Sequence, residues 1–457
     1  MSDASTTRPH VIVVGGGFAG MSAVRALRKA DVEITLVDRH MYNTFQPLLY
    51  QVATAGLNPG DITYFLRSVR ARQKNVHFRK ARVTGVDAGA RTVTLETGEQ
   101  LTYDYLVLSA GVTTNYFGVP GAAEHALAMY TRKQALIVRD KLFSDVEAAA
   151  AAGHPDDLRF VVVGGGATGV EMAGALAEMR NTALQTTHPE LDTARVHIML
   201  VEMGEHVLAP FAPKLRTYAA EQLRKRDVDL RLSTSVKEVR PDAVVVNDGQ
   251  VVPASMVIWA TGVTVHGSVN SWGLPQGRGG RIVVGQDLRV EGHDNVFAVG
   301  DLALTPDALP QLAQPAIQGG AHAGEQIQAL LAGEPTKPFK YRDKGTMATI
   351  GKYAAVAEIA HFPKLKGFLA WAIWLFVHII SLLGNRNRLA TTINLGGRYL
   401  AWPRTFNAIV GEVPTPMPSL SMGSDRDPGD VGGHSKSDET PADGESGSPG
   451  AKDSTYA

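Results

Sequence analysis

The segment VIVVGGGFAG, residues 11–20, contains the first structural signature of this 457-residue chain. Its first four residues are β-branched, which is typical of a strand that is buried on both faces. Three glycines follow with the spacing G-x-G-x-x-G, and residues 21–29 have the pattern of a helix. These glycines permit a tight turn and let a pyrophosphate approach the backbone at the positive end of that helix. The segment therefore predicts a dinucleotide site contacted by Gly15, Gly17, Phe18, Ala19 and Gly20.

The second predicted strand ends at Asp38, where a carboxylate is placed to accept a hydrogen bond from a ribose hydroxyl group. Arg39 follows, and the uncharged, aromatic-rich segment NTFQPLLYQVA continues over residues 43–53. We expect this segment, including Pro47 and Leu48, to lie along the ring of a flavin. The alternative is an ordinary helix packed on the sheet.

The glycine motif occurs a second time, 149 residues further along the chain. A buried strand is predicted over residues 160–163 and a helix over residues 170–178. Between them the same spacing is formed by Gly164, Gly166 and Gly169. Two such motifs in one chain predict two dinucleotide-binding domains. We therefore expect two different dinucleotides to be held face to face.

The strand predicted over residues 196–201 ends at Glu202, the acid expected to hold the second ribose. An acid at this position repels a 2′-phosphate, so the sequence favours NADH over NADPH. Residues 186–195 have the composition of an inserted loop, which lengthens the usual spacing before this acid. Glu171 is expected in the first turn of the second motif's helix. It is either a carboxylate stabilised by the helix N-terminus or a group that faces the gap between nicotinamide and flavin and handles a proton.

Three further strands lead into residue pairs expected at a cofactor, and the first two pairs are small enough to let the backbone approach it. The pairs after these strands are Ala110-Gly111, Thr261-Gly262 and Gly300-Asp301. The Asp301 carboxylate is suited to accept hydrogen bonds from the ribityl hydroxyl groups of a flavin, although a plain turn at a strand end is the alternative. The alternating stretches 76–101 and 228–252 predict antiparallel meanders, and residues 133–152 predict a helix.

The hexapeptide AQPAIQ, residues 313–318, opens a helix predicted to end near residue 331. Gln314 and Gln318 are four residues apart and therefore share one face of this helix. The backbone amides at the helix start, around Ala313 and Gln314, are placed to reach the pyrimidine edge of the flavin.

The segment GFLAWAIWLFVHIISLLG, residues 367–384, is apolar and contains one ionisable side chain, His378. Its 18 residues, at about 1.5 Å each, are short for a membrane span, which normally needs about 20. Flanking basic residues and two internal tryptophans favour a helix that lies in the membrane interface. A buried dimer helix and a true span are the alternatives, and His378 is expected to be a packed residue or one at the membrane edge. From residue 413 onward the composition is that of a disordered tail.

Composition excludes several classes of function. The 45 basic and 45 acidic side chains balance, so the charge gives no argument for nucleic acid as a partner. The absence of cysteine excludes chemistry through cysteine pairs, iron–sulfur clusters and thiolate metal sites, and we expect no metal. The first ten residues, MSDASTTRPH, contain no apolar core, so we expect no signal peptide and a protein that begins in the cytosol.

With these features combined, the chain resembles the type II NADH dehydrogenases, single-subunit flavoproteins that reduce membrane quinone. The resemblance covers residues 11–402 and is most specific over residues 45–53, 313–318 and 368–388. It implies that Gln314 and Gln318 contact the quinone beside the flavin, and that Glu171 takes part in handling a proton or substrate. It also implies that the helices of residues 367–399 form a membrane anchor and often a dimer contact.

We therefore expect an α/β fold with two Rossmann-like dinucleotide-binding domains, one for FAD and one for NADH, and a C-terminal helical membrane-anchoring region. The predicted boundaries are 1–120 (FAD, first part), 121–265 (NADH), 266–345 (FAD, second part), 346–412 (membrane anchor) and 413–457 (tail).

The expected reaction is the transfer of two electrons from NADH through non-covalent FAD to a membrane quinone, menaquinone or ubiquinone, in the respiratory chain without proton pumping. We expect peripheral attachment to the cytoplasmic face of the inner (plasma) membrane through residues 368–388, with a homodimer as one expected arrangement.

Two alternative functions stay open at this point. A soluble NAD(P)H:acceptor reductase of the same fold would feed a small protein or a dye, and its location would not depend on residues 368–388. An NADH-sensing flavoprotein would turn over slowly and act through a bound partner, and quinone would fail to discharge its reduced complex.

Overall fold

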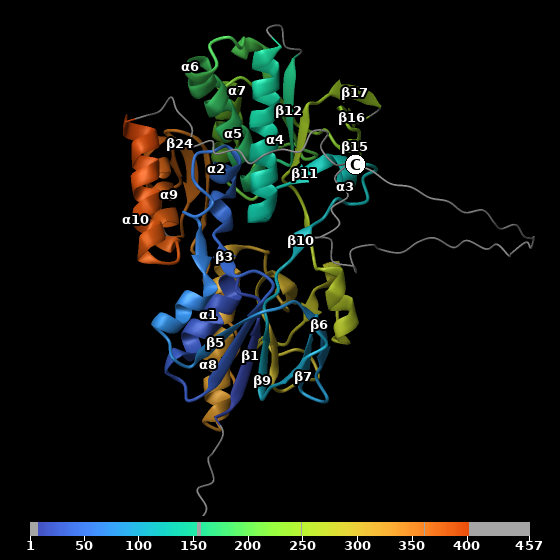
Figure 1. Cartoon of the computed structure of the whole chain (residues 1–457), viewed down its shortest axis with the longest axis vertical. Coiled ribbons are helices and arrows are strands. Elements are labelled where there is room, and N and C mark those ends of the chain that lie inside the picture. Colours follow the sequence, from blue (N-terminus) through green and yellow to red (C-terminus); the bar gives the residue numbers. More distant parts are fainter. Residues whose placement is uncertain (1–7, 153–156, 248, 361, 402–457) are drawn as a thin grey trace, which may run out of the picture.

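The computed structural model describes residues 8–152, 157–247, 249–360 and 362–401, and the predicted tail from residue 413 lies outside them. Two α/β units follow one another along the long axis of the molecule (Figure 1). The first unit contains the first glycine motif, and the second unit contains the second motif. A C-terminal unit stands beside the second, with helices α9 (Phe368–Ser381) and α10 (Asn385–Gly396) at its outer side.

The first unit is built on a five-stranded parallel sheet with the order β21-β9-β1-β2-β5. Its strands are β1 (His10–Val14), β2 (Glu33–Asp38), β5 (Val76–Lys80), β9 (Tyr105–Leu108) and β21 (Val296–Ala298). Helix α1 (Phe18–Ala26) packs against this sheet, and α8 (Ala313–Leu331) packs against α1. A Cβ atom at Gly320 would lie 2.0 Å from the carbonyl oxygen of Ala19, so glycine is needed for this approach. The packing brings the start of α8 to the first glycine turn.

The stretch 76–101 is not one antiparallel meander, contrary to the prediction. Its first strand, β5, joins the parallel sheet beside β2. The antiparallel part contains only β6 (Val83–Asp87), β7 (Thr92–Leu95) and β8 (Gln100–Thr102). An edge strand of a parallel sheet is half exposed, as β5 is, and its sequence therefore resembles that of a meander strand.

The second unit repeats this plan with the strand order β11-β18-β12-β13-β14, again all parallel. Its strands are β11 (Ala126–Ala128), β12 (Leu158–Val163), β13 (Val196–Val201), β14 (Val228–Arg231) and β18 (Met256–Trp259). The helices of this unit are α4 (Arg132–Ala151), α5 (Ala167–Glu178) and α7 (Pro213–Arg224). Both units thus have the Rossmann-like parallel sheet that the paired glycine motifs predict.

Two predictions for the second unit need correction. The stretch 228–252 contributes its first strand, β14, to the parallel sheet, and only β15 (Val236–Val239), β16 (Ala243–Val246) and β17 (Gln250–Pro253) are antiparallel. Residues 186–195 are only partly a loop, because α5 continues through a π-helical segment (Met179–Leu184) into α6 (Gln185–Thr187). A 3-10 turn (Thr193–Arg195) then leads into β13.

Short segments connect the units. Strands β10 (Thr113–Thr114) and β19 (Val263–Thr264) pair antiparallel between them (Figure 1). Strand β19 follows Gly262 directly and β10 begins two residues after Gly111, so these two predicted cofactor contacts lie next to the junction. The remaining short elements are β3 (Tyr42–Thr44), α2 (Leu49–Ala53), β4 (Thr63–Phe65), α3 (Ala122–His125), β20 (Ile282–Val283) and β22 (Ala303–Leu304).

The C-terminal unit begins with a small antiparallel sheet, which the expectation of a purely helical region missed. The sheet contains β23 (Thr346–Gly351), β24 (Ala354–Glu358) and β25 (Leu365–Lys366). Strand β23 packs on helix α5, where a Cβ atom at Gly174 would lie 2.4 Å from the carbonyl oxygen of Ile350. Among the described residues, no helix has both the length and the apolar character needed to cross a membrane.

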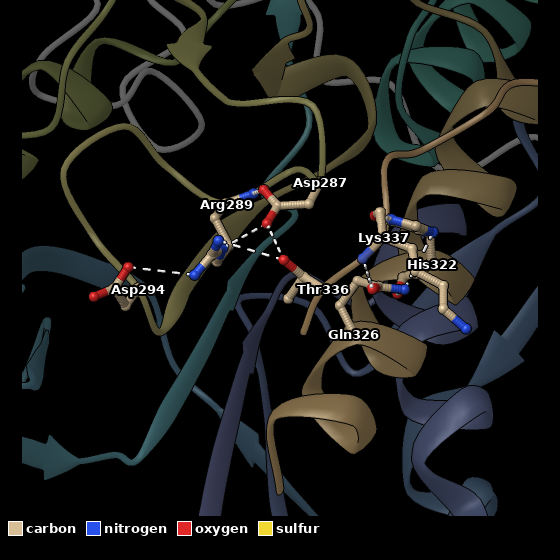
Figure 2. A network of polar contacts seen from close by, with 7 residues as sticks. All are labelled: Asp287, Arg289, Asp294, His322, Gln326, Thr336 and Lys337. Atoms are coloured by element: carbon tan, nitrogen blue, oxygen red, sulfur yellow. Dashed lines mark hydrogen bonds and ion pairs between the residues drawn. The ribbon is translucent and has the colours of Figure 1, made fainter. Parts of the chain in front are cut away.

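The segment between α8 and β23 is fixed to the first unit by polar contacts. Thr336 Oγ1 donates a hydrogen bond to Asp287 Oδ2 at 2.6 Å, and the same oxygen accepts from Arg289 Nε at 2.6 Å (Figure 2). Arg289 also pairs with Asp294 at 3.3 Å. This network holds the start of the segment on a loop of the first unit.

Three side chains of α8 hold the same segment along its length. Gln326 Oε1 accepts from the backbone N–H of Lys337 at 2.6 Å, and His322 Nε2 lies 3.0 Å from the carbonyl oxygen of Lys337 (Figure 2). One turn earlier in the helix, Gln318 binds both backbone groups of Arg342, at 3.0 Å and 2.9 Å. These three side chains are spaced four residues apart, so one face of α8 is used for this contact.

Candidate active site at the junction of the three units

A cavity of about 530 Å³ is lined by residues of both α/β units and of the C-terminal unit. It extends from the first glycine turn to helix α9. Of the residues predicted to hold FAD, its lining contains Gly15, Gly17, Phe18, Ala19, Asp38, Arg39, Pro47, Ala110, Gly111, Gly300, Asp301 and Ala313. Gly20, Leu48 and Gln314 lie outside this lining.

The first glycine turn has the geometry of a phosphate cradle. Gly15 has a φ of +101°, which side chains with a Cβ atom rarely adopt. A Cβ atom at Gly17 would meet nothing within 4 Å, so the space beside this residue is open to a ligand. Gly20 serves packing, because its Cβ position lies 1.8 Å from the carbonyl oxygen of Gly15. The third glycine therefore sets the close approach of helix and turn rather than a cofactor contact.

Asp38 fixes the shape of this turn. Its Oδ2 accepts a hydrogen bond from the Gly16 amide and its Oδ1 one from the His40 amide, each at 2.6 Å. Asn43 Nδ2 donates to the Gly16 carbonyl oxygen at 2.8 Å from the other side. Burial raises the pKa of the Asp38 carboxyl, and the two amides oppose this shift by stabilising the charge.

Asp301 also lines the cavity, three residues after the end of β21. Burial raises the pKa of its carboxyl to about 6, while Arg281 and the hydroxyl group of Tyr130 favour the ionised form. At neutral pH the group is therefore mainly a carboxylate with free acceptor capacity. This fits hydrogen bonds from ligand hydroxyl groups, as expected of a residue that binds a ribityl chain.

Glu202 has the same role in the second unit as Asp38 has in the first. Its Oε2 accepts from the Gly165 amide at 2.5 Å and its Oε1 from the Gly204 amide at 2.6 Å. The residues predicted for NADH that lie outside the cavity lining are Gly164, Gly166, Gly169, Glu202, Thr261 and Gly262. Helix α5 of this motif reaches the cavity with Ala167, Thr168 and Glu171. One end of the second site is thus continuous with the first.

Glu171 is a buried acid in the cavity wall. It lies in the second turn of α5, one turn further in than predicted, because the helix already begins at Ala167. Burial raises the pKa of its carboxyl to about 8. The Thr349 amide, 3.3 Å from Oε1, and the nearby indole of Trp374 offset this shift only in part. The side chain is therefore protonated at neutral pH and can give a proton to a ligand in the cavity.

A row of rings connects the first glycine turn to helix α9. Ring centroids are 5.8 Å apart between Phe18 and Phe45, and 6.1 Å apart between Phe45 and His378. His378 stacks on Trp374 at 4.1 Å, and Trp374 lies 6.2 Å from Tyr50. The inner face of α9 is therefore part of the site wall, so the expectation of a packed His378 is correct but incomplete.

The two glutamines of AQPAIQ occupy different surroundings. Gln314 follows Ala313, which lines the cavity, and its Oε1 is buried without a hydrogen-bond partner among the described residues. A buried amide oxygen of this kind is typical of a ligand site. Gln318 lies outside the lining, and its amide group is used for the two bonds to Arg342. Its predicted contact with quinone stays a prediction that rests on the resemblance.

Sequence reasoning assigned no site role to several residues of the wall, among them Asn43, Tyr130 and His378. His378 carried a usable signal, since it is the one ionisable side chain in an apolar segment. The sequence contains no such signal for Tyr130, because its position at the cavity depends on how the chain crosses between the units.

Among the residues that the structure describes, no group of three or more His, Asp or Glu side chains could hold a metal ion.

Comparisons with known families agree with this arrangement. Residues 9–320 match the pyridine nucleotide-disulphide oxidoreductase family, and residues 344–401 match the NDH2 C-terminal domain. The solved structure of NDH2 from Plasmodium falciparum in complex with NADH has a TM-score of 0.79, with 19% sequence identity. That match covers 86% of this chain and 99% of the Plasmodium chain. The sulfide:quinone oxidoreductase from Aquifex aeolicus has a TM-score of 0.69 and 18% identity, over 86% of this chain and 96% of that one. These two likenesses show the fold.

Curated relatives give higher identity over nearly the whole length. The type II NADH:quinone oxidoreductase NdhA of Mycobacterium tuberculosis is 37% identical over 426 residues, which are 89% of this chain and 90% of the relative. The type II NADH:quinone oxidoreductase Ndh of the same organism is 36% identical, over 87% and 88% of the two chains. A type II NADH:quinone oxidoreductase of Staphylococcus aureus is 32% identical, over 78% of this chain and 91% of the relative.

Proposed function

This chain belongs to the type II NADH:quinone oxidoreductase family, and from that membership we propose that it transfers two electrons from NADH through FAD to a membrane quinone without pumping protons. The cavity is the observation that supports this best. It joins the first glycine turn to Glu171 of the second unit and to His378 of the C-terminal unit. A ligand bound along it would meet side chains of all three units.

The residues of the first unit fit FAD. The glycine turn would hold the pyrophosphate, Asp38 the ribose and Asp301 the ribityl hydroxyl groups. When bound, FAD accepts a hydride from NADH and passes two electrons to an acceptor. The protein contributes orientation and exclusion of water. We propose non-covalent binding, because the chain has no cysteine that could form a thioether. For the same reason it lacks the cysteine pair needed for disulfide chemistry.

The second unit is the proposed NADH site. Glu202 would accept hydrogen bonds from the adenosine ribose, and its charge disfavours the 2′-phosphate of NADPH. The turn around Gly166 would bind the pyrophosphate, and the nicotinamide would then approach the cavity at Glu171. Thr261 and Gly262 directly precede β19, which pairs with β10 between the units, and they would contact the same ligand.

Glu171 is the proposed proton donor to the quinone. Reduction of a quinone to a quinol takes up two electrons and two protons. A hydride equivalent supplies both electrons and one proton, so one further proton is needed. The protonated carboxyl of Glu171 can supply it and becomes a carboxylate, which then recovers a proton from solvent.

The outer faces of α9 and α10 are the proposed membrane contact. Large apolar side chains on them are 47–64% exposed, namely Leu369, Phe376, Ile380, Leu389 and Ile393. Basic residues precede and follow α9 along the chain, which suits a helix in the headgroup region of a bilayer. We propose peripheral attachment at the cytoplasmic face of the inner membrane, with menaquinone or ubiquinone as the acceptor. A second copy of the chain on the same surface would give the homodimer.

Stopped-flow absorbance of the flavin tests the whole proposal. NADH is added anaerobically to the purified FAD-loaded protein, followed by a short-chain quinone. We expect rapid bleaching and then rapid recovery of the oxidised flavin spectrum. Bleaching without recovery would refute the quinone assignment and favour a reductase with another acceptor or an NADH sensor. Absence of bleaching would refute the NADH site as well.

A further inference from the structure

The His378 side chain has a fixed hydrogen-bonding pattern. Its Nδ1 lies 2.6 Å from the carbonyl oxygen of Trp374, one turn earlier in α9. A carbonyl oxygen only accepts hydrogen bonds, so Nδ1 carries the proton. Burial lowers the pKa of the ring to about 4, so the imidazole is neutral at physiological pH. Nε2 then has a lone pair and no hydrogen.

The surroundings hold the His378 ring in place at the wall of the cavity. Trp374 stacks on one face of the ring, with an interplanar angle of 24°, and Phe45 meets it edge-on. His378 lines the cavity, and Nε2 has no hydrogen-bond partner among the described residues. The backbone bond through Nδ1 prevents the ring from turning over without loss of that bond. The cavity thus holds a preorganised acceptor at the end nearest the C-terminal unit.

An acceptor at this point distinguishes the two redox forms of a quinone. The oxygens of a quinone are carbonyl acceptors, and their lone pairs would face the lone pair of Nε2. The oxygens of a quinol are hydroxyl groups and can donate to it. The contact therefore becomes favourable only when a proton has reached the ligand oxygen.

We propose that Nε2 of His378 accepts a hydrogen bond from a hydroxyl group of the quinol, and that this contact forms as the quinone oxygen gains its proton. The inference rests on the proposed function. The proton itself comes from Glu171 or with the hydride equivalent, and His378 keeps its protonation state throughout. An interaction that strengthens along the reaction lowers the barrier, whereas equal binding of substrate and transition state would not. His378 is on this view a catalytic residue of the quinone half-reaction.

Anaerobic binding of menadione and menadiol to the FAD-loaded full chain tests this. His378→Phe keeps a ring on Trp374 and removes the acceptor, and His378→Gln restores an acceptor oxygen. Ile379→Val, the next residue on α9, is the matched control for packing. We expect His378→Phe to weaken menadiol binding about tenfold, the loss of one hydrogen bond, and menadione binding less than twofold. His378→Gln and Ile379→Val should bind both ligands nearly as the unchanged protein does.

The results that would refute the role of Nε2 differ from those that would refute the proposed function. Equal weakening of both ligands in His378→Phe, or no weakening of menadiol, would refute the role of Nε2. If His378→Phe fails to fold, His378→Leu takes its place, because it also removes the acceptor, and a selective loss of menadiol affinity is again the expected result. The proposed function would instead be refuted if NADH bleached the flavin of the unchanged protein and menadione did not restore its oxidised spectrum.

Discussion

Asp38 and Glu202 hold equivalent glycine turns in the two α/β units. Asp38 is the last residue of β2, and Glu202 follows β13 directly. Each accepts the amide hydrogen of the middle glycine of its turn, Gly16 at 2.6 Å and Gly165 at 2.5 Å. Each also accepts a second amide, from the residue two positions after the acid. The acids therefore shape the turns as well as present charge to a ribose. This double role allows the two sites to be tested against each other.

Glu202→Gln should narrow the preference for NADH over NADPH. The change removes the negative charge that repels a 2′-phosphate and keeps an acceptor for the Gly165 amide. We expect the ratio of kcat/KM values for the two nucleotides to fall by about tenfold or more, with FAD content unchanged. Steady-state kinetics with both nucleotides measures this, and an unchanged ratio would remove Glu202 from the nucleotide site.

Asp38→Asn is the matched change in the first unit and should act on FAD instead. The ribose contact and the charge-assisted bonds to two amides are weakened, so the flavin should dissociate more readily. We expect a lower ratio of flavin absorbance to protein absorbance after gel filtration, and an unchanged nucleotide preference in the FAD-loaded fraction. A shift of nucleotide preference here would contradict the assignment of the two units.

Gln314→Ala and Gln318→Ala should separate a ligand contact from a structural one. Gln314 has a buried amide oxygen without a partner among the described residues, whereas Gln318 binds both backbone groups of Arg342. We expect Gln314→Ala to slow flavin reoxidation by quinone with little change in Tm. Gln318→Ala should lower Tm, since two hydrogen bonds of about 0.5–1.5 kcal/mol each are lost, and slow quinone reduction less. If Gln318→Ala slowed flavin reoxidation by quinone more than Gln314→Ala did, Gln318 would be the quinone contact.

The glycine turns could be predicted because their geometry leaves few other residues possible. Gly15 and Gly164 have φ values of +101° and +113°, and Cβ atoms at Gly20 and Gly169 would each lie 1.8 Å from a carbonyl oxygen. Such constraints appear in the sequence as glycine at fixed spacing. Asp38 and Glu202 could be predicted as well, because the end of the neighbouring parallel strand lies beside the glycine turn.

Side-chain direction in the C-terminal helices could not be predicted in this way. Helix α9 is apolar on all sides, so its sequence contains no contrast between a core face and an outer face. Only the packing shows that Trp374 is buried and His378 lines the cavity, while Phe376 faces outward. The same holds for Gln318, whose partner Arg342 becomes a neighbour only when the segment after α8 folds back.

The outer face of α9 should hold the protein on a bilayer. Leu369, Phe376 and Ile380 are 56%, 64% and 47% exposed, so the triple change to serine should leave the core intact. Even at about 1 kcal/mol per side chain, below the roughly 1.5–3 kcal/mol of full burial, affinity for liposomes should fall about a hundredfold. Co-sedimentation with liposomes of mixed anionic and neutral lipids measures this.

The control for that experiment is Val251→Ser, a change at an exposed apolar residue of β17 in the second unit. It should leave liposome binding unchanged. If the triple variant still binds as well as the unchanged protein, the membrane contact lies elsewhere on the molecule. If the unchanged protein itself does not bind liposomes, a soluble reductase is favoured. If the triple variant loses a dimer in gel filtration but keeps its liposome affinity, the surface is a contact between copies.

Glu171→Gln should remove a pH dependence from both activity and stability. The carboxyl has a pKa of about 8, above its ordinary value of 4.5, so it is protonated below pH 8 and loses its proton above it. Flavin reoxidation by quinone should therefore slow as pH rises through 8, and Glu171→Gln should be slow at every pH without this decline.

Between pH 4.5 and 8 the folded state keeps a proton that the unfolded chain releases. The free energy of unfolding should thus fall with rising pH, by at most about 1.4 kcal/mol per pH unit. Tm measured from pH 5 to 9 should decline less in Glu171→Gln than in the unchanged protein, and parallel curves would show that the carboxyl is not buried as a neutral acid.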